Sequence, residues 1–107
     1  MKKIVIIDKE PIVRRLIRLA LPKTETEIFD FENFAKSFHF IEGIAPDVVL
    51  VDRETIRGEE KLLERLGSAK IIALAKNLPE SETLLFDGVL SKPISPTGLW
   101  EKILDLI

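Results

Sequence analysis

Two stretches decide the fold of this chain, Lys3-Ile-Val-Ile-Ile-Asp8 and Asp47-Val-Val-Leu-Val-Asp52. Each contains a short, uninterrupted apolar run rich in β-branched residues, and each run ends at an aspartate. An uninterrupted run predicts a strand that is covered on both faces, which is typical of a parallel sheet. We therefore expect strands over Lys3–Ile7 and Asp47–Val51 at the centre of an α/β domain.

Outward from these two runs, apolar strands alternate with amphipathic helices along the whole chain. The only short interval lies between Ala75 and Val89, where there is room for no more than a stunted helix. Alternation of this kind predicts a doubly wound, five-stranded parallel sheet with the flavodoxin-like order 2-1-3-4-5 and a shortened fourth helix. The further strands are expected over Thr26–Asp30, Lys70–Ala75 and Gly88–Ser91, and the helices over Pro11–Leu21, Glu32–Ile41 (with Gly43 at its end), Glu59–Leu66 (with Gly67 as its stop), Pro79–Phe86 and Ser95–Ile107.

The composition limits the classes of function. A chain of 107 residues, 46% hydrophobic and 32% charged, fits one domain spanning residues 1–107. A formal net charge of −2 gives no basic surface for nucleic acid, and no apolar run approaches the roughly 18 residues of a membrane span. The chain has no cysteine, which excludes disulfides and thiol catalysis. We expect a cytoplasmic protein that binds neither nucleic acid nor membrane.

Ionisable residues follow three of the predicted strands. Asp8 follows the first strand, Asp52 the third, and Lys92 the last. In open α/β sheets, ligands bind beyond the carboxyl ends of the strands, where the strand order reverses. We therefore expect the two carboxylates and the ammonium to meet at one edge of the sheet, although polar residues also commonly end buried strands.

The sequence around these three residues resembles the receiver domain of two-component response regulators over nearly the whole chain. The resemblance implies that Asp52 is the phosphoacceptor for a histidine kinase and that Lys92 contacts the phosphoryl group. It also implies that acidic residues after the first strand, here Asp8, hold Mg²⁺ together with Asp52. The motifs that carry the resemblance are Ile4-Val-Ile-Ile-Asp8-Lys9-Glu10-Pro11, Pro46-Asp47-Val-Val-Leu-Val-Asp52 and Leu90-Ser91-Lys92-Pro93.

The chain departs from the receiver pattern at positions that the resemblance makes functional. Lys9 replaces the second acidic Mg²⁺ ligand. Ala75 stands where the family has the hydroxyl residue that contacts the phosphoryl group, and Val89 where it usually has the aromatic switch residue. The hydroxyl and the aromatic move together in the family, so their loss removes the two-state element that switching requires.

The charge of the site follows from Lys9. Asp8, Asp52, Lys9 and Lys92 sum to zero, whereas a complete family site carries three carboxylates and one lysine. Two placements of Lys9 are open: it pairs inward with Asp52 or Asp8 in place of the metal ion, or it points into solvent as lysines usually do. Glu54 is a candidate replacement carboxylate for a metal ion. We expect Mg²⁺ binding through Asp8, Asp52 and Glu54 to be weak or absent.

These residues predict a non-enzymatic, atypical receiver domain that acts through protein–protein contacts, with weakened Mg²⁺-dependent phosphorylation at Asp52. One alternative is a competent phosphoacceptor that tolerates its substitutions. A second is a flavodoxin-like binder of a small cofactor. The segment Asp8-Lys9-Glu10-Pro11 disfavours that second alternative because it has no glycine and places acid where a phosphate needs N–H donors.

The last helix and the first helix offer surfaces for partners such as a histidine kinase or another signalling protein. In the last helix, the apolar residues Trp100, Leu104 and Ile107 form a stripe beside a second stripe of Leu99, Ile103 and Leu106. The two stripes together cover a wider arc than a helix needs to face one core. The stripe of Trp100 either packs under the shortened fourth helix or forms an exposed flank for dimerisation or docking. We interpret three arginines of the first helix as a solvated outer face: Arg14, Arg15 and Arg18.

Overall fold

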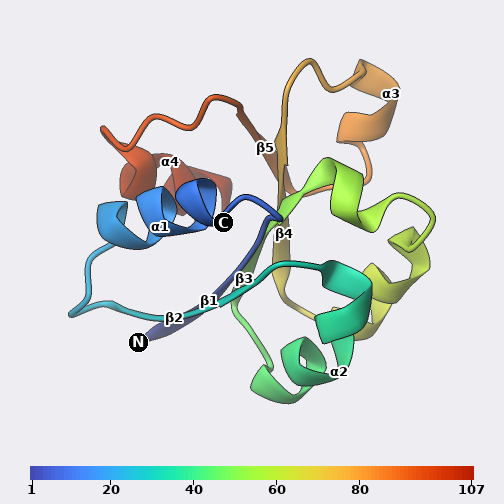
Figure 1. Ribbon diagram of the computed structural model, residues 1–107, viewed down its shortest axis with the longest axis horizontal. Helices are drawn as coiled ribbons and strands as arrows, with labels where there is room; N and C mark the ends of the chain where they lie inside the picture. The colour runs from blue at the N-terminus through green and yellow to red at the C-terminus, as the bar shows by residue number, and fades with distance from the viewer.

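Five parallel strands form the centre of the protein in the order β2-β1-β3-β4-β5 (Figure 1), which confirms the expected fold class. The computed structural model describes all of residues 1–107. The strands are β1 Lys2–Ile7, β2 Thr26–Phe31, β3 Val48–Asp52, β4 Lys70–Ala75 and β5 Gly88–Ser91; the helices are α1 Pro11–Ala20, α2 Phe34–Ile44, α3 Glu80–Thr83 and α4 Leu99–Leu106, and two 3-10 helices are η1 Arg53–Ile56 and η2 Glu60–Leu66.

The uninterrupted apolar runs exist because the sheet has a core on each face. In β1, Ile4 and Ile6 belong to one cluster of eleven buried residues, and Val5 and Ile7 belong to a second cluster of eleven. All four side chains are fully buried. Successive residues of a strand point to opposite faces, so a strand between two cores has to be apolar at every position.

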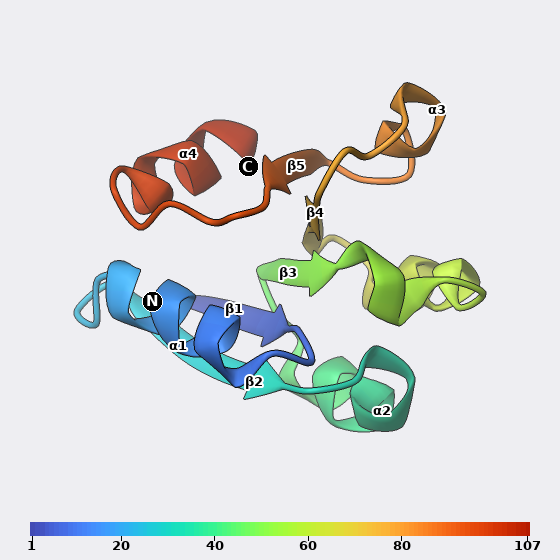
Figure 2. The same cartoon turned by 45° about the horizontal axis from the view of Figure 1, so that its top comes forward.

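Helices cover both cores (Figure 2). The first core receives Ile17 from α1 and Ile103 from α4. The second receives Phe34 and Phe38 from α2 together with Leu66 from η2. This layering is the doubly wound arrangement expected from the alternation of elements. None of the helices has the length and apolarity that crossing a bilayer demands.

The helix α2 begins and ends later than expected. Its cap is Asn33, whose side-chain oxygen accepts a hydrogen bond from the amide of Lys36 at 2.9 Å. Because the cap satisfies an amide that would otherwise lack a partner, the helix starts at Phe34 rather than at Glu32. At the other end, Gly43 lies inside the helix, and Ala45 ends it with a φ of 54°.

Three other helical elements are shorter or tighter than predicted. The segment expected to be an α-helix over Glu59–Leu66 forms the 3-10 helix η2, which ends at Gly67 as expected. The shortened fourth helix is reduced further, to Glu80–Thr83. The last helix starts at Leu99 rather than Ser95, because Gly98 has a φ of 69° and cannot continue a right-handed helix.

Two arginines of α1 pair with a carboxylate of β2. Arg14 Nε lies 3.5 Å from Asp30 Oδ2, and Arg18 Nη2 lies 3.1 Å from Asp30 Oδ1. The interpretation of these arginines as a solvated outer face was therefore wrong for Arg14, whose side chain is 19% exposed. It holds for Arg15, and in part for Arg18, whose side chain is 43% exposed although it is paired. The reason is that both long cationic side chains reach the Asp30 carboxylate on β2. The periodicity of the helix does not reveal a pairing with a residue of another element.

Candidate functional site

The carboxyl edge of the sheet brings Asp8, Asp52 and Lys92 together. Asp8 follows the last residue of β1, Asp52 ends β3, and Lys92 follows β5. Because β1 and β3 are neighbours, the two aspartates lie side by side at the point where strand order reverses. The sequence-based expectation that these three groups meet is confirmed.

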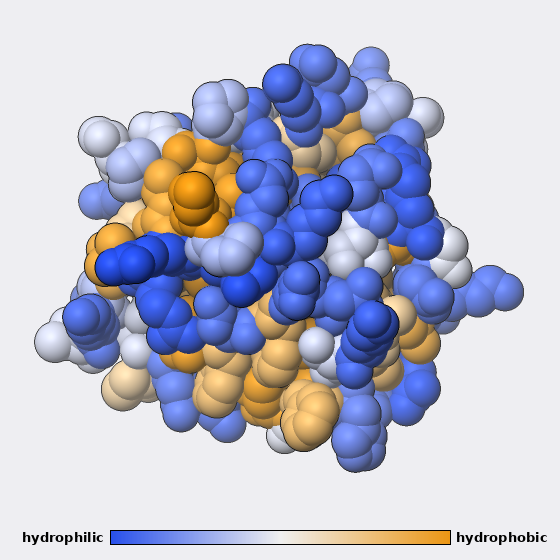
Figure 3. All heavy atoms as spheres, viewed as in Figure 1, coloured by the Kyte–Doolittle hydropathy of each residue, from blue (hydrophilic) through white to orange (hydrophobic).

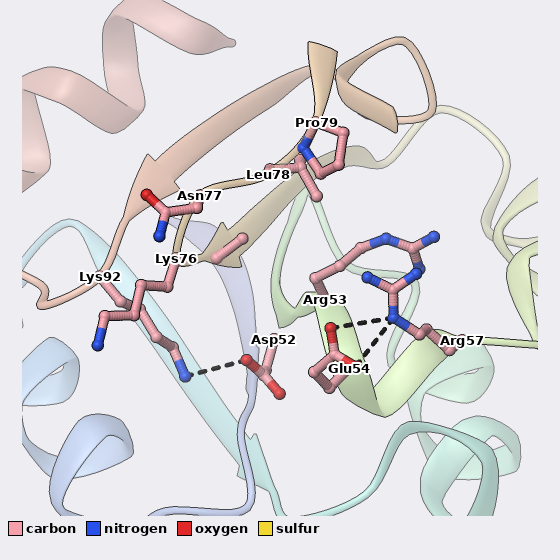
Figure 4. A pocket seen from close by; sticks show the side chains of 10 residues that line it. Asp52, Arg53, Glu54, Arg57, Lys76, Asn77, Leu78, Pro79 and Lys92 are labelled. Atoms are coloured by element: carbon pink, nitrogen blue, oxygen red, sulfur yellow. Dashed lines mark hydrogen bonds and ion pairs between the residues drawn. The ribbon is translucent and has the colours of Figure 1, made fainter. Parts of the chain in front are cut away.

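The Lys92 ammonium bridges the two carboxylates. Its Nζ donates to Asp8 Oδ2 at 2.7 Å and lies 2.9 Å from Asp52 Oδ1. Figure 4 shows the Lys92 side chain extending toward Asp52 beside the cavity. Asp8 is 1% exposed and Asp52 is 8% exposed. Two carboxylates so well shielded from water need a cation, and Lys92 supplies it.

This bridge alters the acidity of Lys92. Partial burial disfavours the charged ammonium, but the hydrogen bonds to Asp8 and Asp52 and the attraction of their charges outweigh it. The net result is a pKa of Lys92 above its ordinary value. The side chain is therefore a fixed cation at neutral pH, and it holds the two carboxylates together as a charged group.

Asp8 has further partners besides Lys92. Its Oδ1 accepts a hydrogen bond from the backbone amide of Glu10 at 2.9 Å. Its backbone carbonyl accepts one from Arg14 Nη1 at 2.7 Å. Both carboxylate oxygens of Asp8 are thus occupied by donors of the protein itself, and the side chain is held in one orientation.

Lys9 does not take part in this cluster. Its side chain is exposed, and it forms no ion pair within 4.0 Å. Of the two placements left open by the sequence, the inward pairing with Asp52 or Asp8 is wrong and the solvent-facing one is right. The physical reason is that Lys92 already occupies the position between the two carboxylates. Lys9 instead borders a hollow of about 320 Å³ that Asp52 and Glu54 also line.

Glu54 lies beside Asp52 but is engaged by an arginine. Both of its carboxylate oxygens accept from Arg57 Nε, at 2.9 and 3.0 Å, as Figure 4 shows. This hydrogen bonding is the main cause that lowers the pKa of Glu54, and the positive charges of Arg57, Arg53 and Lys9 add to it. The carboxylate that could have replaced a missing metal ligand therefore already has a cationic partner.

The donor set does not fit a magnesium ion. Mg²⁺ requires oxygen ligands in near-octahedral geometry. Among the six carboxylate oxygens of Asp8, Asp52 and Glu54, five already lie within bonding distance of a protein nitrogen, and Asp52 Oδ2 is the exception. No group of three or more acidic or histidine side chains is arranged to hold a metal ion.

A cavity of about 170 Å³ adjoins Asp52 and Lys92. Ala75, at the end of β4, lines it with a methyl group that can neither donate nor accept a hydrogen bond. Val89 lies in β5 and is half-buried. The cavity therefore contains no hydroxyl group from β4 that could contact an occupant beside Asp52.

Arg53 is the residue of this region that the sequence did not single out. It follows Asp52 directly, and only 4% of it is exposed. Its guanidinium bonds Glu82 at 2.8 Å and Glu60 at 3.0 Å, and it lies 5.6 Å from the centre of the Phe86 ring. The available signal was a basic residue placed directly after a fully buried strand, with acidic residues in the two segments that contain Glu60 and Glu82.

The flank of α4 is partly covered. Trp100 is half-buried against the first core, and its Nε1 donates to Glu25 Oε2 at 3.0 Å. It therefore packs toward the start of β2 rather than under α3. Leu104, one turn further along the helix, is 43% exposed, and Ile107 is half-buried.

Comparison with solved structures identifies the fold. A response regulator from Thermotoga maritima matches with a TM-score of 0.83 at 18% identity, and the match covers 100% of this chain and 98% of that one. The receiver domain of a response regulator from Geobacillus stearothermophilus matches with a TM-score of 0.83 at 22% identity over 98% and 92% of the two chains. A response regulator receiver modulated diguanylate cyclase from Pelobacter carbinolicus matches with a TM-score of 0.77 at 23% identity over 99% and 92%.

The sequence by itself finds no such match. No protein-family model and no curated protein matches the chain. At identities below 25%, the structural matches identify the fold alone. The chain thus has the fold of response regulator receiver domains along nearly its whole length.

Proposed function

We propose that this chain is a signal-transduction receiver domain of atypical type. In this proposal Asp52 occupies the phosphoacceptor position and Lys92 the position that contacts the phosphoryl group. Mg²⁺-dependent phosphorylation is weak or absent, and the domain acts through contacts with a histidine kinase or another signalling protein. The receiver fold supports the signalling role, and the chemistry of the carboxyl edge supports the atypical part.

One observation carries the atypical part. Lys92 offsets one of the two negative charges of Asp8 and Asp52, at 2.7 and 2.9 Å, and the next residue after Asp8 is a lysine rather than a third carboxylate. A carboxylate that accepts a phosphoryl group repels it unless a cation offsets the charge. With one of the two carboxylate charges offset by Lys92, and with the positive charge of Lys9 nearby, the electrostatic attraction for a divalent cation is largely lost.

A phosphoryl mimic tests this proposal. We expect that Mg²⁺ with beryllofluoride, or with acetyl phosphate, produces no saturable change in the amide NMR spectrum at Asp52 and none at α4. The measurement is a titration followed by two-dimensional NMR of the whole chain. Tight, saturable binding at Asp52 with shifts that extend to α4 would contradict the proposal.

A competent phosphoacceptor remains the second candidate. It is favoured by the bond between Lys92 and Asp52 and by Asp52 Oδ2, which has no protein donor and belongs to a residue that lines the cavity. Under this alternative, acetyl phosphate adds one phosphoryl mass to the chain. The Asp52→Asn variant stays unmodified. The two candidates are therefore separated by one mass spectrum.

A flavodoxin-like cofactor binder is the third candidate, and the residues support it least. The two hollows beside Asp52 are lined mostly by charged and polar side chains, whereas small cofactors bind in mainly apolar clefts. Visible absorbance of the purified protein would favour it. A spectrum with only the protein band favours the signalling role.

The surface of α1 and α4 is the contact surface that we propose. Four of the seven most exposed large apolar side chains lie on α1, on α4 or at the adjoining start of the chain: Met1, Ile12, Leu19 and Leu104. Figure 3 shows apolar side chains gathered over the region where Figure 1 has α1 and α4. Such a patch marks an interaction site more often than isolated exposed residues do.

The charges on this surface suit a second copy of the chain. Exposed Arg15 on α1 and exposed Glu101 and Asp105 on α4 allow reciprocal ion pairs across a two-fold axis. We expect Leu104→Lys to weaken self-association about tenfold or more, because a charge would enter an apolar contact. Analytical ultracentrifugation over a wide concentration range measures the effect.

Phe40→Lys is the matched control for this prediction. Phe40 is 66% exposed on α2, which covers the opposite face of the sheet, so the same charge is added away from the proposed contact. A wild-type protein that stays monomeric at the highest concentration, or an equal effect of both substitutions, would rule out a dimer through this surface.

A further inference from the structure

The helix α3 has little apolar attachment to the rest of the protein. None of its four residues is buried. The two leucines that follow it, Leu84 and Leu85, are 88% and 48% exposed. Phe86 is the one residue of the segment 76–87 that packs against a core, and it does so while half-buried. Something other than hydrophobic burial therefore holds this segment on the sheet.

Ion pairs provide that attachment, and the main one is made by Arg53, the residue that follows β3. Arg53 Nε donates to Glu82 Oε1 of α3 at 2.8 Å, and Arg53 Nη1 donates to Glu60 Oε2 at 3.0 Å. A guanidinium that is 4% exposed needs such partners, and charge-assisted hydrogen bonds are stronger than those between neutral groups. The Phe86 ring lies over the same guanidinium.

A second arginine is shared between α3 and the edge of the candidate site. Arg57 Nη1 donates to Glu82 Oε1 at 3.2 Å, while Arg57 Nε donates to both oxygens of Glu54. Glu54 and Arg57 line the cavity beside Asp52, as Figure 4 shows. One guanidinium thus bonds a carboxylate at the site through Nε and a carboxylate on α3 through Nη1.

We propose that Arg53 and Arg57 form an ionic latch. The latch couples the charge in the cavity beside Asp52 to the docking of α3 on the rest of the protein. Arg53 holds Glu82 through its Nε, and in this proposal Arg57 is the variable part, for which Glu54 and Glu82 compete. An anion in the cavity beside Asp52 draws Arg57 away from Glu82 and loosens the segment that bears Leu84 and Leu85. This coupling substitutes for the hydroxyl and aromatic pair that Ala75 and Val89 have lost.

The competition predicts effects of opposite sign from two similar substitutions. Glu82→Gln removes the carboxylate on α3, and we expect amide hydrogen exchange in residues 80–86 to become about tenfold faster. Glu54→Gln frees Arg57 for Glu82, and we expect exchange in the same residues to become about threefold slower. A purely structural role for these carboxylates would make both substitutions accelerate exchange.

Arg65→Gln is the matched control. Arg65 also bonds a glutamate through two nitrogens, Glu42 at 2.9 and 3.1 Å, on the exposed surface away from α3. We expect its removal to leave exchange in residues 80–86 unchanged. Inorganic phosphate added to the wild-type chain is the anion probe, and it should accelerate exchange in these residues beyond the effect of an equal ionic strength of chloride.

Several results would overturn the latch. They are faster exchange in Glu54→Gln, unchanged exchange in Glu82→Gln, acceleration spread evenly over the whole chain, or an effect of phosphate no greater than that of chloride. The latch serves the proposed signalling role, but these measurements need neither phosphorylation nor a metal ion. A failed latch therefore leaves the proposed function intact, and efficient phosphorylation of Asp52, which would contradict the proposed function, leaves the latch intact.

Discussion

Replacing Lys92 by methionine is expected to destabilise the protein by about 3 kcal/mol at neutral pH. The substitution keeps the length of the side chain and removes the charge that bridges Asp8 and Asp52. Two nearly buried carboxylates then face each other without a cation, and breaking such a pair costs roughly 3–5 kcal/mol. The lower end applies because Lys92 is itself 19% exposed. Urea unfolding followed by circular dichroism measures the change.

The same pair of proteins gives a pH signature. Because the pKa of Lys92 is raised in the folded state, its contribution to stability is fully present below the unfolded value of about 10.4 and is lost as pH rises through the folded value. We expect the difference in unfolding free energy between wild type and Lys92→Met to stay constant from pH 7 to about pH 10 and to shrink above it.

Lys76→Met is the control for both measurements. Lys76 lines the same cavity, but it is exposed and forms no ion pair. We expect a change within about 0.5 kcal/mol and no alkaline signature. Equal destabilisation by the two substitutions would mean that the bridge has no special role, and a stable Lys92→Met would mean that Asp8 and Asp52 find another cation.

Replacing Lys9 by aspartate is expected to increase the affinity of the chain for magnesium. The substitution supplies the third carboxylate that the receiver pattern implies beside Asp8 and Asp52, and it changes the local charge by two units. At about 6 Å in a water-like dielectric, that change favours a divalent ion by roughly 3 kcal/mol, which is about a hundredfold in affinity. Isothermal titration calorimetry with Mg²⁺ alone measures the dissociation constant.

Lys36→Asp is the matched control for this prediction. Lys36 lines the same hollow as Lys9 and undergoes the same change of charge, but it lies on α2 rather than beside Asp8. We expect it to gain much less affinity, since general attraction without a third ligand does not complete a magnesium site. Equal gains would show that only the overall charge matters, and no gain from Lys9→Asp would show that Lys92 by itself excludes the ion.

The sheet could be predicted because its signal is local. The four β1 residues from Ile4 to Ile7 are all apolar because each faces one of two cores, and a strand between two cores leaves no other pattern. The alternation of elements predicted a parallel, doubly wound sheet, and the structure confirms the expected strand order. The helix ends were less predictable, since Asn33 and Gly98 act through a cap and a backbone angle rather than through hydrophobic periodicity.

The polar network of the site could be predicted only in part. That Asp8, Asp52 and Lys92 converge follows from their places at the ends of parallel strands. The position of Arg53 directly after a buried strand hinted at its burial, but its partners Glu60 and Glu82 could not be identified, because they lie 7 and 29 residues away. Long flexible side chains choose among several partners, and the choice depends on distances that exist only in the folded chain.

The amino-acid sequence alone determined which groups reach the carboxyl edge of the sheet, because apolar runs set the strands and the strands carry their end residues with them. Only the tertiary structure decided which lysine stands between the carboxylates. Lys92 follows β5, which lies two strands from β3 and three from β1, and it meets both aspartates, while Lys9, adjacent to Asp8 in sequence, turns to solvent. The strength of an ion pair depends on the distance between the two charged groups to within about an ångström, and adjacency in the sequence does not fix that distance.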